Sequence, residues 1–377
     1  MYWLALRMLI GHRARYLAML FGLTFASLLI CQQLSIFCGV LRMCAGLIRD
    51  VQDAPIWVLS ARTQYIDDLA PLAQGRVEEV RGVPGVAWAV PFQKGYAQVH
   101  LGDGRFQQVV LLGLDDSTLV GAPRTLLAGD LADLRRPDAV LIDEVGHQRL
   151  WPGSPLRTGW AVTMNGRRAV VVGVCRSAPT FQTLPVFYTR RSQAARYLPP
   201  QGETVSAVLV RGREGEAPEE VCRRISARTG LLALTREQWV RRTVEHYLRR
   251  TGLLLNFATT VLLGFMVGLA ISGQSFYTFT VESLPQFGVL KAMGTSDGRL
   301  VAILLLQTGV VSGTGFGLGV GLAAAYGEAT RGHSKLVFHM PWQVLVLTGV
   351  AVLLVTLLTS VLSIRRVLRL EPGIIVR

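Results

Sequence analysis

The chain has 377 residues, half of them hydrophobic, and a formal net charge of +14. Soluble globular proteins seldom combine a positive mean hydropathy with so large a charge, so the apolar residues are expected to be concentrated in a few segments. Arginine supplies almost all of the positive charge, and no stripe of basic and aromatic residues recurs along one predicted element. A nucleic-acid partner is therefore not expected.

Four apolar runs of about 19 to 26 residues are long enough to cross a hydrocarbon layer of roughly 30 Å as helices. They predict transmembrane segments at 17–40, 253–273, 300–325 and 343–363. A secretory signal peptide is the alternative for the first run. Its apolar part would be only about 7 to 15 residues long and would precede a small-residue cleavage site. Because this run is longer and is followed by Arg42, Met43 and Cys44, a retained anchor is favoured.

Basic residues lie beside three of the predicted membrane ends. They are Arg7, Arg13 and Arg15 before the first span, Lys291 and Arg299 after the second, and Arg365, Arg366 and Arg369 after the fourth. The positive-inside rule places these ends and both termini in the cytoplasm. The parts outside the spans are then a cytoplasmic amphipathic segment at 1–16, a cytoplasmic loop at 274–299, a short periplasmic loop at 326–342 and a cytoplasmic basic tail at 364–377.

The stretch between the first and second spans is predicted to be a mixed α/β domain at 41–235, followed by a stalk helix at 236–252. Short β-branched or alternating runs bounded by Gly, Pro or Asp indicate strands at 56–60, 86–91, 97–101, 108–113 and 139–142. Apolar spacing indicates helices at 67–81, 218–229 and 236–250, and Asn165-Gly166 indicates a tight hairpin turn. The expected fold is an α-helical four-span transmembrane domain with a large mixed α/β extracytoplasmic domain between spans 1 and 2.

No catalytic, cofactor-binding or metal-binding constellation emerges from the sequence. The paired carboxylates are Asp67 with Asp68, Asp115 with Asp116, and Asp143 with Glu144. Adjacent side chains on a strand point to opposite faces, which favours caps or turns over a catalytic pair. The histidines occur singly, and none of the three lysines follows a glycine as a phosphate-binding P-loop requires. ATP and Mg²⁺ are therefore expected in a partner chain.

Cysteine and glycine positions suggest two structural roles. Cys175 and Cys222 both lie in the predicted outer domain, where an oxidising compartment would permit a disulfide, with two separate thiols as the alternative. Glycines occupy several faces of the third span. The small-xxx-small spacing of Gly309, Gly313, Gly317 and Gly321 predicts close helix packing.

The segment 287–300, FGVLKAMGTSDGRL, is a short amphipathic stretch between two long apolar runs. It is too polar for the bilayer and too brief for a domain, so it is expected to lie along a membrane face where a partner can hold it.

The order of one span, a large outer domain and three further spans, together with the sequence VESLPQFGVLKAMGTSDGRL, resembles the MacB and FtsX type of ABC-transporter permease, including the DevC-like exporters. The matching positions of the loop are Phe287, Gly288, Val289, Leu290, Lys291, Ala292, Met293, Gly294 and Ser296. Glu282 is retained, but Leu284 and Pro285 stand where the family usually has charged residues. The tail RRVLRLEPGI at 365–374 and outer segments such as VRGVPGVAWAVPF also resemble this family.

The resemblance implies a homodimeric permease of the bacterial inner membrane that binds two copies of a separate ABC ATPase and contacts membrane lipids. A periplasmic adaptor and an outer-membrane duct would complete an export route for a lipid, drug or peptide-like substrate. In this view the loop docks on the ATPase, with Phe287, Val289, Leu290 and Met293 as apolar anchors. Lys291 would meet an acidic rim, Gly288 and Gly294 would allow close approach and end the helix, and Glu282 would stand at the start of the coupling segment.

Two other functions are consistent with this organisation. An FtsX-like regulatory subunit would use the same motion to activate a periplasmic partner without transporting a substrate. A membrane-bound enzyme with an outer catalytic domain is less favoured, because the sequence offers no nucleophile and base in a recognisable arrangement.

Overall fold

The computed structural model describes residues 13–200, 202–330 and 338–368, together with Trp3, Arg7 and Leu9. The chain divides into two compact units, Met1–Val40 with Gly252–Arg377 and Leu41–Thr251. We call them the membrane unit and the outer unit. Most of the predicted segments 1–16 and 364–377, and part of the predicted loop at 326–342, lie outside the described residues.

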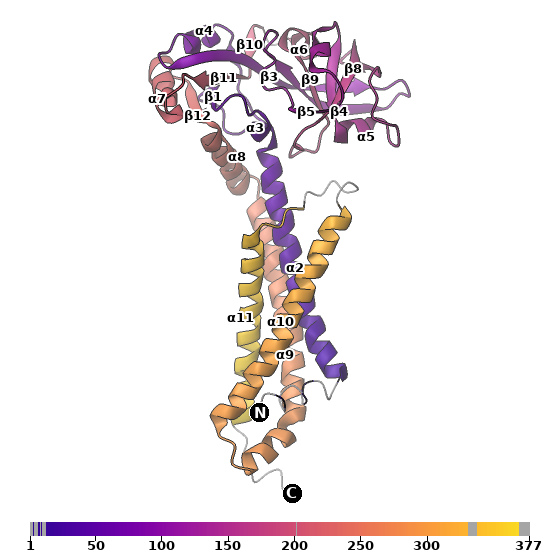
Figure 1. Cartoon of the computed structure of the whole chain (residues 1–377), viewed down its shortest axis with the longest axis vertical. Helices are drawn as coiled ribbons and strands as arrows, with labels where there is room; N and C mark the ends of the chain where they lie inside the picture. The colour runs from indigo at the N-terminus through magenta and orange to yellow at the C-terminus, as the bar shows by residue number, and fades with distance from the viewer. Residues whose placement is uncertain are drawn as a thin grey trace. The chain divides into compact units, whose positions relative to one another are not determined.

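Among the described residues of the membrane unit there are four long helices (Figure 1). They are α2 (Arg13–Cys44), α9 (Leu253–Ala292), α10 (Asp297–Thr330) and α11 (Trp342–Leu368). Each is long and apolar enough to cross a membrane. The four expected spans therefore correspond to four helices, and every one of these helices begins or ends beyond the predicted apolar run.

Close packing joins these helices around an apolar centre. Met19 and Leu23 of α2, Phe276 and Phe279 of α9, Val311 of α10 and Val355 of α11 are all buried in one cluster. Glycines let α2 approach both α9 and α10, because a Cβ at Gly268 would overlap Ala26 Cβ and one at Gly315 would lie 2.8 Å from Leu23 Cβ. Small residues permit such approach where lipid supplies no hydrophobic driving force.

The second membrane helix is longer than its apolar run. We expected a span ending at 273 and a separate loop at 274–299, but α9 continues for 40 residues to Ala292, with Pro285 inside it. A helix of that length extends about 60 Å, twice the roughly 30 Å of a hydrocarbon layer. The residues after 273 are more polar than those before, but they stay helical as far as Ala292. The predicted loop is thus mostly helix, and only a tight turn separates α9 from α10.

Twelve strands build the described part of the outer unit, residues 41–200 and 202–251. Eight of them have the bounds β1 (Ile56–Leu59), β2 (Leu72–Ala73), β3 (Val86–His100), β4 (Phe106–Leu114), β5 (Thr125–Gly129), β6 (Ala139–Asp143), β7 (Ala161–Met164) and β8 (Arg167–Arg176). The remaining four are β9 (Val186–Arg190), β10 (Thr204–Val205), β11 (Ala207–Gly212) and β12 (Leu232–Thr235). The helices are α3 (Gly46–Asp50), α4 (Arg76–Arg81), η1 (Leu131–Arg135), α5 (Glu144–Leu150), α6 (Arg191–Tyr197), α7 (Pro218–Thr229) and α8 (Arg236–Arg250).

The long strand β3 organises the main sheet, whose order is β12-β1-β11-β3-β4-β9-β6-β8-β5. Residues 86–92 of β3 pair with β11, and residues 93–100 pair with β4. Strand β7 pairs with both β3 and β8, so the strands β3, β4, β9, β6, β8 and β7 close on themselves. Strand β5 pairs with β8 at the end of the sheet, and strands β1, β11 and β12 lie on the opposite side of β3 in Figure 1.

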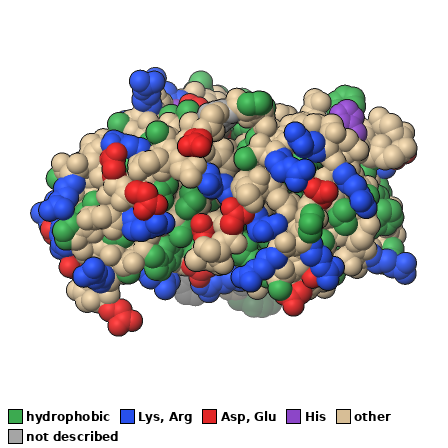
Figure 2. All heavy atoms as spheres, turned by 90° about the horizontal axis from the view of Figure 1, so that it is seen from above, with side chains coloured by type: hydrophobic (Ala, Val, Ile, Leu, Met, Phe, Trp, Pro, Cys, Tyr) green, Lys and Arg blue, Asp and Glu red, His purple; other side chains and the backbone are tan. Residues whose placement is uncertain are grey.

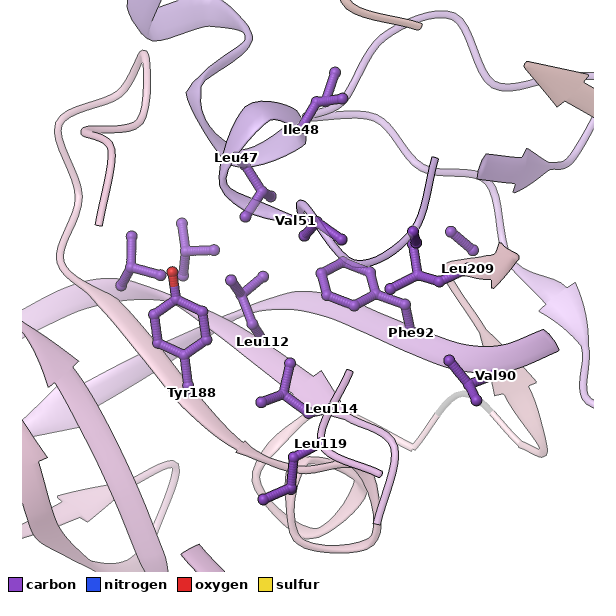
Figure 3. Packing of buried hydrophobic residues seen from close by; sticks show 14 of the residues in the cluster. Leu47, Ile48, Val51, Val90, Phe92, Leu112, Leu114, Leu119, Tyr188 and Leu209 are labelled. Atoms are coloured by element: carbon purple, nitrogen blue, oxygen red, sulfur yellow. The ribbon is translucent and has the colours of Figure 1, made fainter. Parts of the chain in front are cut away.

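Three apolar clusters stabilise the outer unit. One fills the closed set of strands with alternating residues such as Val109, Leu111, Val140, Ile142 and Phe187. A second joins the β1–β11 side to α4 and α7. The third joins the first residues of the unit to the sheet. Figure 3 shows its members Leu47, Ile48, Val51, Val90, Phe92, Leu112, Leu114, Leu119, Tyr188 and Leu209.

Local predictions for the outer unit mostly hold. Helix α7 has the predicted bounds, and α8 matches the helix predicted at 236–250 but ends two residues before the predicted end of the stalk helix, because Gly252 has φ of +68° and caps the start of α9. The Asn165-Gly166 turn has φ values of 47° and 79°, as a primed hairpin turn requires. The predicted helix at 67–81 is wrong over its first half. Pro71 cannot donate to a helix, and residues 72–73 instead form β2, so only α4 remains helical. The strands predicted at 86–91 and 97–101 are two parts of β3.

Charges are mixed on one face of the molecule. On the face shown in Figure 2, Lys and Arg side chains alternate with acidic and apolar ones, without one broad basic area.

Candidate functional site

The turn between α9 and α10 is fixed by a glycine-capped helix end. Thr295 N–H donates to the Leu290 carbonyl at 3.1 Å, and Gly294 N–H donates to the Lys291 carbonyl at 3.0 Å. These two bonds make a Schellman motif, in which the residue after the cap takes a left-handed conformation. Gly294 has φ of +88° and fulfils that role, as predicted for the end of the helix. We call residues 293–296 the coupling turn.

The four apolar residues predicted as anchors separate into two pairs. Phe287 and Leu290 are 0% and 9% exposed, and they pack in one cluster with Leu300, Ile303 and Leu304 of α10. The prediction that Phe287 and Leu290 contact a partner directly is therefore wrong. They hold α9 against α10, because α10 begins right after the turn and covers this face of α9.

Val289 and Met293 form the second pair and are 56% and 69% exposed. They are four residues apart, so Val289 on the last turn of α9 and Met293, the residue that caps this helix, lie on the same side of its end. Lys291 pairs with Asp297 at 3.0 Å across the coupling turn, so an acidic partner within the chain already faces it. Gly288 is buried, and Glu282 occupies an exposed position of α9. The surface left for a partner is thus Val289, Met293 and the polar residues of the turn.

The glycines predicted to pack helices are placed differently. A Cβ at Gly309, Gly313, Gly317 or Gly321 would meet no atom within 4 Å, so this stripe packs against nothing in the described part of the chain. A Cβ at Gly319 would instead lie 2.5 Å from Ser27 Cβ, so Gly319 sits on the face that touches α2. The prediction was right about close packing and wrong about which glycines provide it within one chain.

Both outer cysteines are separate thiols. Cys175 on β8 donates to the Ile142 carbonyl at 3.4 Å and lies in the cluster that joins the first residues of the outer unit to the sheet. Cys222 lies on the buried face of α7, in the cluster on the β1–β11 side. The disulfide between Cys175 and Cys222 is not formed. Burial raises the pKa of both thiols, which keeps them protonated at neutral pH.

A polar network unnoticed in the sequence joins helix α8 to the sheet. Lys94 of β3 pairs with Asp67 at 2.6 Å, with 4% and 10% of their side chains exposed, and Lys94 Nζ also donates to the Ile66 carbonyl at 3.0 Å. The Tyr247 hydroxyl of α8 donates to the second Asp67 oxygen. We call Lys94, Asp67 and Tyr247 the stalk joint. Its sequence signal was a single lysine in an arginine-rich domain.

Electrostatics at the stalk joint follow from burial. Desolvation lowers the pKa of Lys94, and the neighbouring Asp67 carboxylate opposes that shift. Desolvation and the hydrogen bond to Asp67 raise the pKa of Tyr247, which remains a neutral donor. Tyr65 packs on this group, with its ring 4.2 Å from that of His246 and 5.4 Å from that of Tyr247. Trp239, buried two turns earlier in α8, lies in the same cluster as Trp57 and Phe92. Helix α8 is thereby fixed to the sheet at two points.

The remaining paired carboxylates have structural partners. Asp143 is buried and accepts from Val186 N–H at 2.7 Å, and Asp115 accepts from Ser117 and Thr118. Across residues 13–200, 202–330 and 338–368, no group of three potential metal ligands is found.

Two family models match the chain. The MacB-like periplasmic core domain matches residues 17–228, more than half of the chain, and the FtsX-like permease C-terminal domain matches residues 256–372. The second match includes the coupling turn, and the first includes Asp67 and Lys94 of the stalk joint.

Two solved structures are also similar. The extracellular domain of the noncanonic ABC-type transporter YknZ from Gram-positive bacteria is 15% identical, covers 48% of this chain and 98% of its own, and has a TM-score of 0.35. The periplasmic region of MacB from Actinobacillus actinomycetemcomitans is 14% identical, covers 53% of this chain and 97% of its own, and has a TM-score of 0.39. On the two family matches, the chain belongs to the MacB/FtsX-type permeases, which are membrane components of ABC transporters.

Proposed function

We propose that this chain couples ATP hydrolysis by a separate ATPase subunit to movement of its outer unit, and thereby exports a lipid, drug or peptide-like substrate. The chain acts as a homodimer with two ATPase copies in the bacterial inner membrane, with both termini and the coupling turn in the cytoplasm. A periplasmic adaptor and an outer-membrane duct are the further partners expected of an exporter of this family.

The observation that carries the proposal is the exposed apolar pair at a rigid turn. Val289 and Met293 lie on the same side of the end of α9, which is fixed by the Gly294 cap. Such a pair costs free energy in water and gains it when a partner groove covers it. We infer that the ATPase provides this groove, because this chain belongs to the permeases of ABC transporters.

The buried residues Phe287 and Leu290 then transmit a displacement of the coupling turn to both helices. Phe287 and Leu290 pack against Leu300, Ile303 and Leu304, so displacing the turn displaces α9 and α10 together. Helix α9 is unbroken from Ala292 back to Leu253, and the chain continues through Thr251 and Gly252 into α8. Helix α8 is fixed to the sheet by Trp239 and the stalk joint.

Docking is tested by co-purification of the full chain with its ATPase. Burying one side chain of this size contributes about 1.5–3 kcal/mol, so Val289→Asp and Met293→Asp each weaken binding by about 10- to 100-fold. Val145→Asp is the matched control, because Val145 is 57% exposed on α5 of the outer unit. Unchanged recovery of both turn variants would refute the assigned surface.

The expected orientation is tested separately with Met293→Cys. An impermeant thiol reagent should label this position only from the cytoplasmic side, and Val145→Cys only from the periplasmic side. Labelling of position 293 from the periplasm would remove the proposed ATP-driven input.

Export itself is tested in vesicles that contain the chain and its ATPase. ATP-dependent movement of a substrate across or out of the membrane supports the proposal. Hydrolysis that changes only the activity of a periplasmic partner would instead assign the chain as an FtsX-like regulatory subunit.

A further inference from the structure

A pocket of about 380 Å³ lies between α3 and α8, within the outer unit. We call it the α3–α8 pocket. Its lining residues are Arg49 of α3 and Arg236, Glu237, Val240, Arg241 and Val244 of α8. No part of the stalk joint or the coupling turn contributes to it, so it is a separate feature of the chain.

The pocket combines an apolar wall with cationic sides. Val240 and Val244 are one helical turn apart and both half-buried, so they form a continuous apolar strip on α8. Three guanidinium groups and one carboxylate surround this strip, for a formal charge of 3 − 1 = +2. The carboxylate, Glu237, pairs with Arg236 at 3.4 Å.

The other two guanidinium groups lack such compensation. Within the described parts of the chain, neither Arg49 nor Arg241 has an acidic partner, and both side chains are exposed. Guanidinium groups bind phosphate and carboxylate oxygens through paired charge-assisted hydrogen bonds, while their methylene stems pack on apolar surface. The pocket therefore favours an anion and disfavours a cation.

The apolar strip distinguishes an amphiphile from a bare anion. An inorganic phosphate would occupy the guanidinium groups and leave Val240 and Val244 uncovered, whereas an acyl chain would cover them. Each of the two helices that line the pocket is also close in sequence to a helix long enough to cross a membrane. Helix α3 follows α2 with only Ala45 between them, and α8 precedes α9 with only Thr251 and Gly252 between them.

We propose that the α3–α8 pocket binds an anionic phospholipid, with the phosphate held by Arg49 and Arg241 and the start of an acyl chain along Val240 and Val244. This binding needs no nucleotide and no ATPase, so it stands or falls independently of the proposed export function.

The test uses the full chain in a neutral detergent with a photoactivatable phosphatidylglycerol, followed by peptide mapping of the cross-links. Label is expected on the α8 peptide that contains Val240 and Val244. Excess phosphatidylglycerol should compete for it, whereas phosphatidylcholine and millimolar inorganic phosphate should not.

Variants link the label to the pocket. Arg49→Gln with Arg241→Gln should reduce α8 labelling about tenfold or more, since two charge-assisted contacts are lost. The control is Arg213→Gln with Arg228→Gln, which removes the same charge from exposed positions elsewhere on the outer unit. Val240→Ser keeps all charges and should reduce labelling severalfold through the apolar strip alone. Near-ultraviolet circular dichroism verifies that each variant is folded.

Three results would overturn the proposal. Absence of label from α8 removes the site, and equal loss in the control pair reduces the effect to net charge. Equal competition by phosphatidylcholine or by inorganic phosphate excludes an anionic phospholipid as the specific occupant.

Discussion

Removing one partner of the stalk joint tests how strongly α8 is held to the sheet. Lys94→Met takes the positive charge from a pair whose side chains are 4% and 10% exposed, and leaves the Asp67 carboxylate buried with only the Tyr247 donor. Breaking a buried ion pair in this way costs about 3–5 kcal/mol. For a unit of this size about 1 kcal/mol shifts the melting temperature by roughly 2–4 °C, so a decrease of about 6–20 °C is expected.

The assay is thermal and denaturant unfolding of the full chain in detergent, followed by tryptophan fluorescence. This signal reports mainly on the outer unit, because five of the seven tryptophans lie between Leu41 and Thr251. Arg213→Met is the control for an exposed cation and should change stability by no more than about 0.5 kcal/mol.

The double variant Lys94→Met with Asp67→Asn decides the physical cause. It removes both charges and retains an oxygen that accepts from Tyr247, so it should recover most of the stability lost in Lys94→Met. If the double variant is as unstable as the sum of the two single variants, the loss does not come from an uncompensated buried charge and the reasoning is refuted.

Three further predictions concern single positions. Burial raises the pKa of Asp143 from 3.8 to about 6, so folding favours the protonated acid: this contribution is fully present below about pH 4, is lost as pH rises through about 6, and amounts to about 3 kcal/mol. Asp143→Asn should reduce the dependence of the denaturation midpoint on pH between pH 4 and 7. The same dependence in the variant and in the unchanged protein would contradict this prediction. Gly319→Ala places a Cβ 2.5 Å from a side-chain carbon of α2 and should destabilise the membrane unit by about 1–3 kcal/mol in thermal unfolding, whereas Gly317→Ala meets no atom within 4 Å and should be neutral or slightly stabilising. Gly294→Val strains a residue at φ of +88° by about 1–2 kcal/mol and should increase protease cleavage at the coupling turn several-fold, while Gly298→Val, without that φ, should not.

Sequence periodicity identified most elements of this protein because their signals are local. The four apolar runs, the α7 and α8 helices and the Asn165-Gly166 turn each depend on a few neighbouring residues. The helix predicted at 67–81 failed over its first half, where Leu72 and Ala73 pair as β2 with β10, more than a hundred residues later in the chain. Pairing with a strand so distant in the sequence does not show in the spacing of nearby apolar residues.

The sequence identified the segment of the candidate site but not which of its apolar side chains are exposed. Composition marked 287–300 as amphipathic, but nothing local shows that α10 covers Phe287 and Leu290 while Val289 and Met293 remain exposed. The same limit applies to the third-span glycines, whose outward and inward stripes have equal spacing. The Lys94–Asp67 pair was missed altogether, because its members are 27 residues apart and meet only through folding.

Strand β3 has a mechanical consequence for the outer unit. Its first half is hydrogen-bonded to β11 and its second half to β4, so one extended backbone of about 50 Å belongs both to the lobe of β1, β11 and β12 and to the lobe of the closed set of strands. Opening a cleft between these lobes would require rupture of a continuous ladder. Because Lys94 lies near the middle of β3, the stalk joint holds α8 to the one strand that both lobes share, and the two lobes are expected to stay together as a single body.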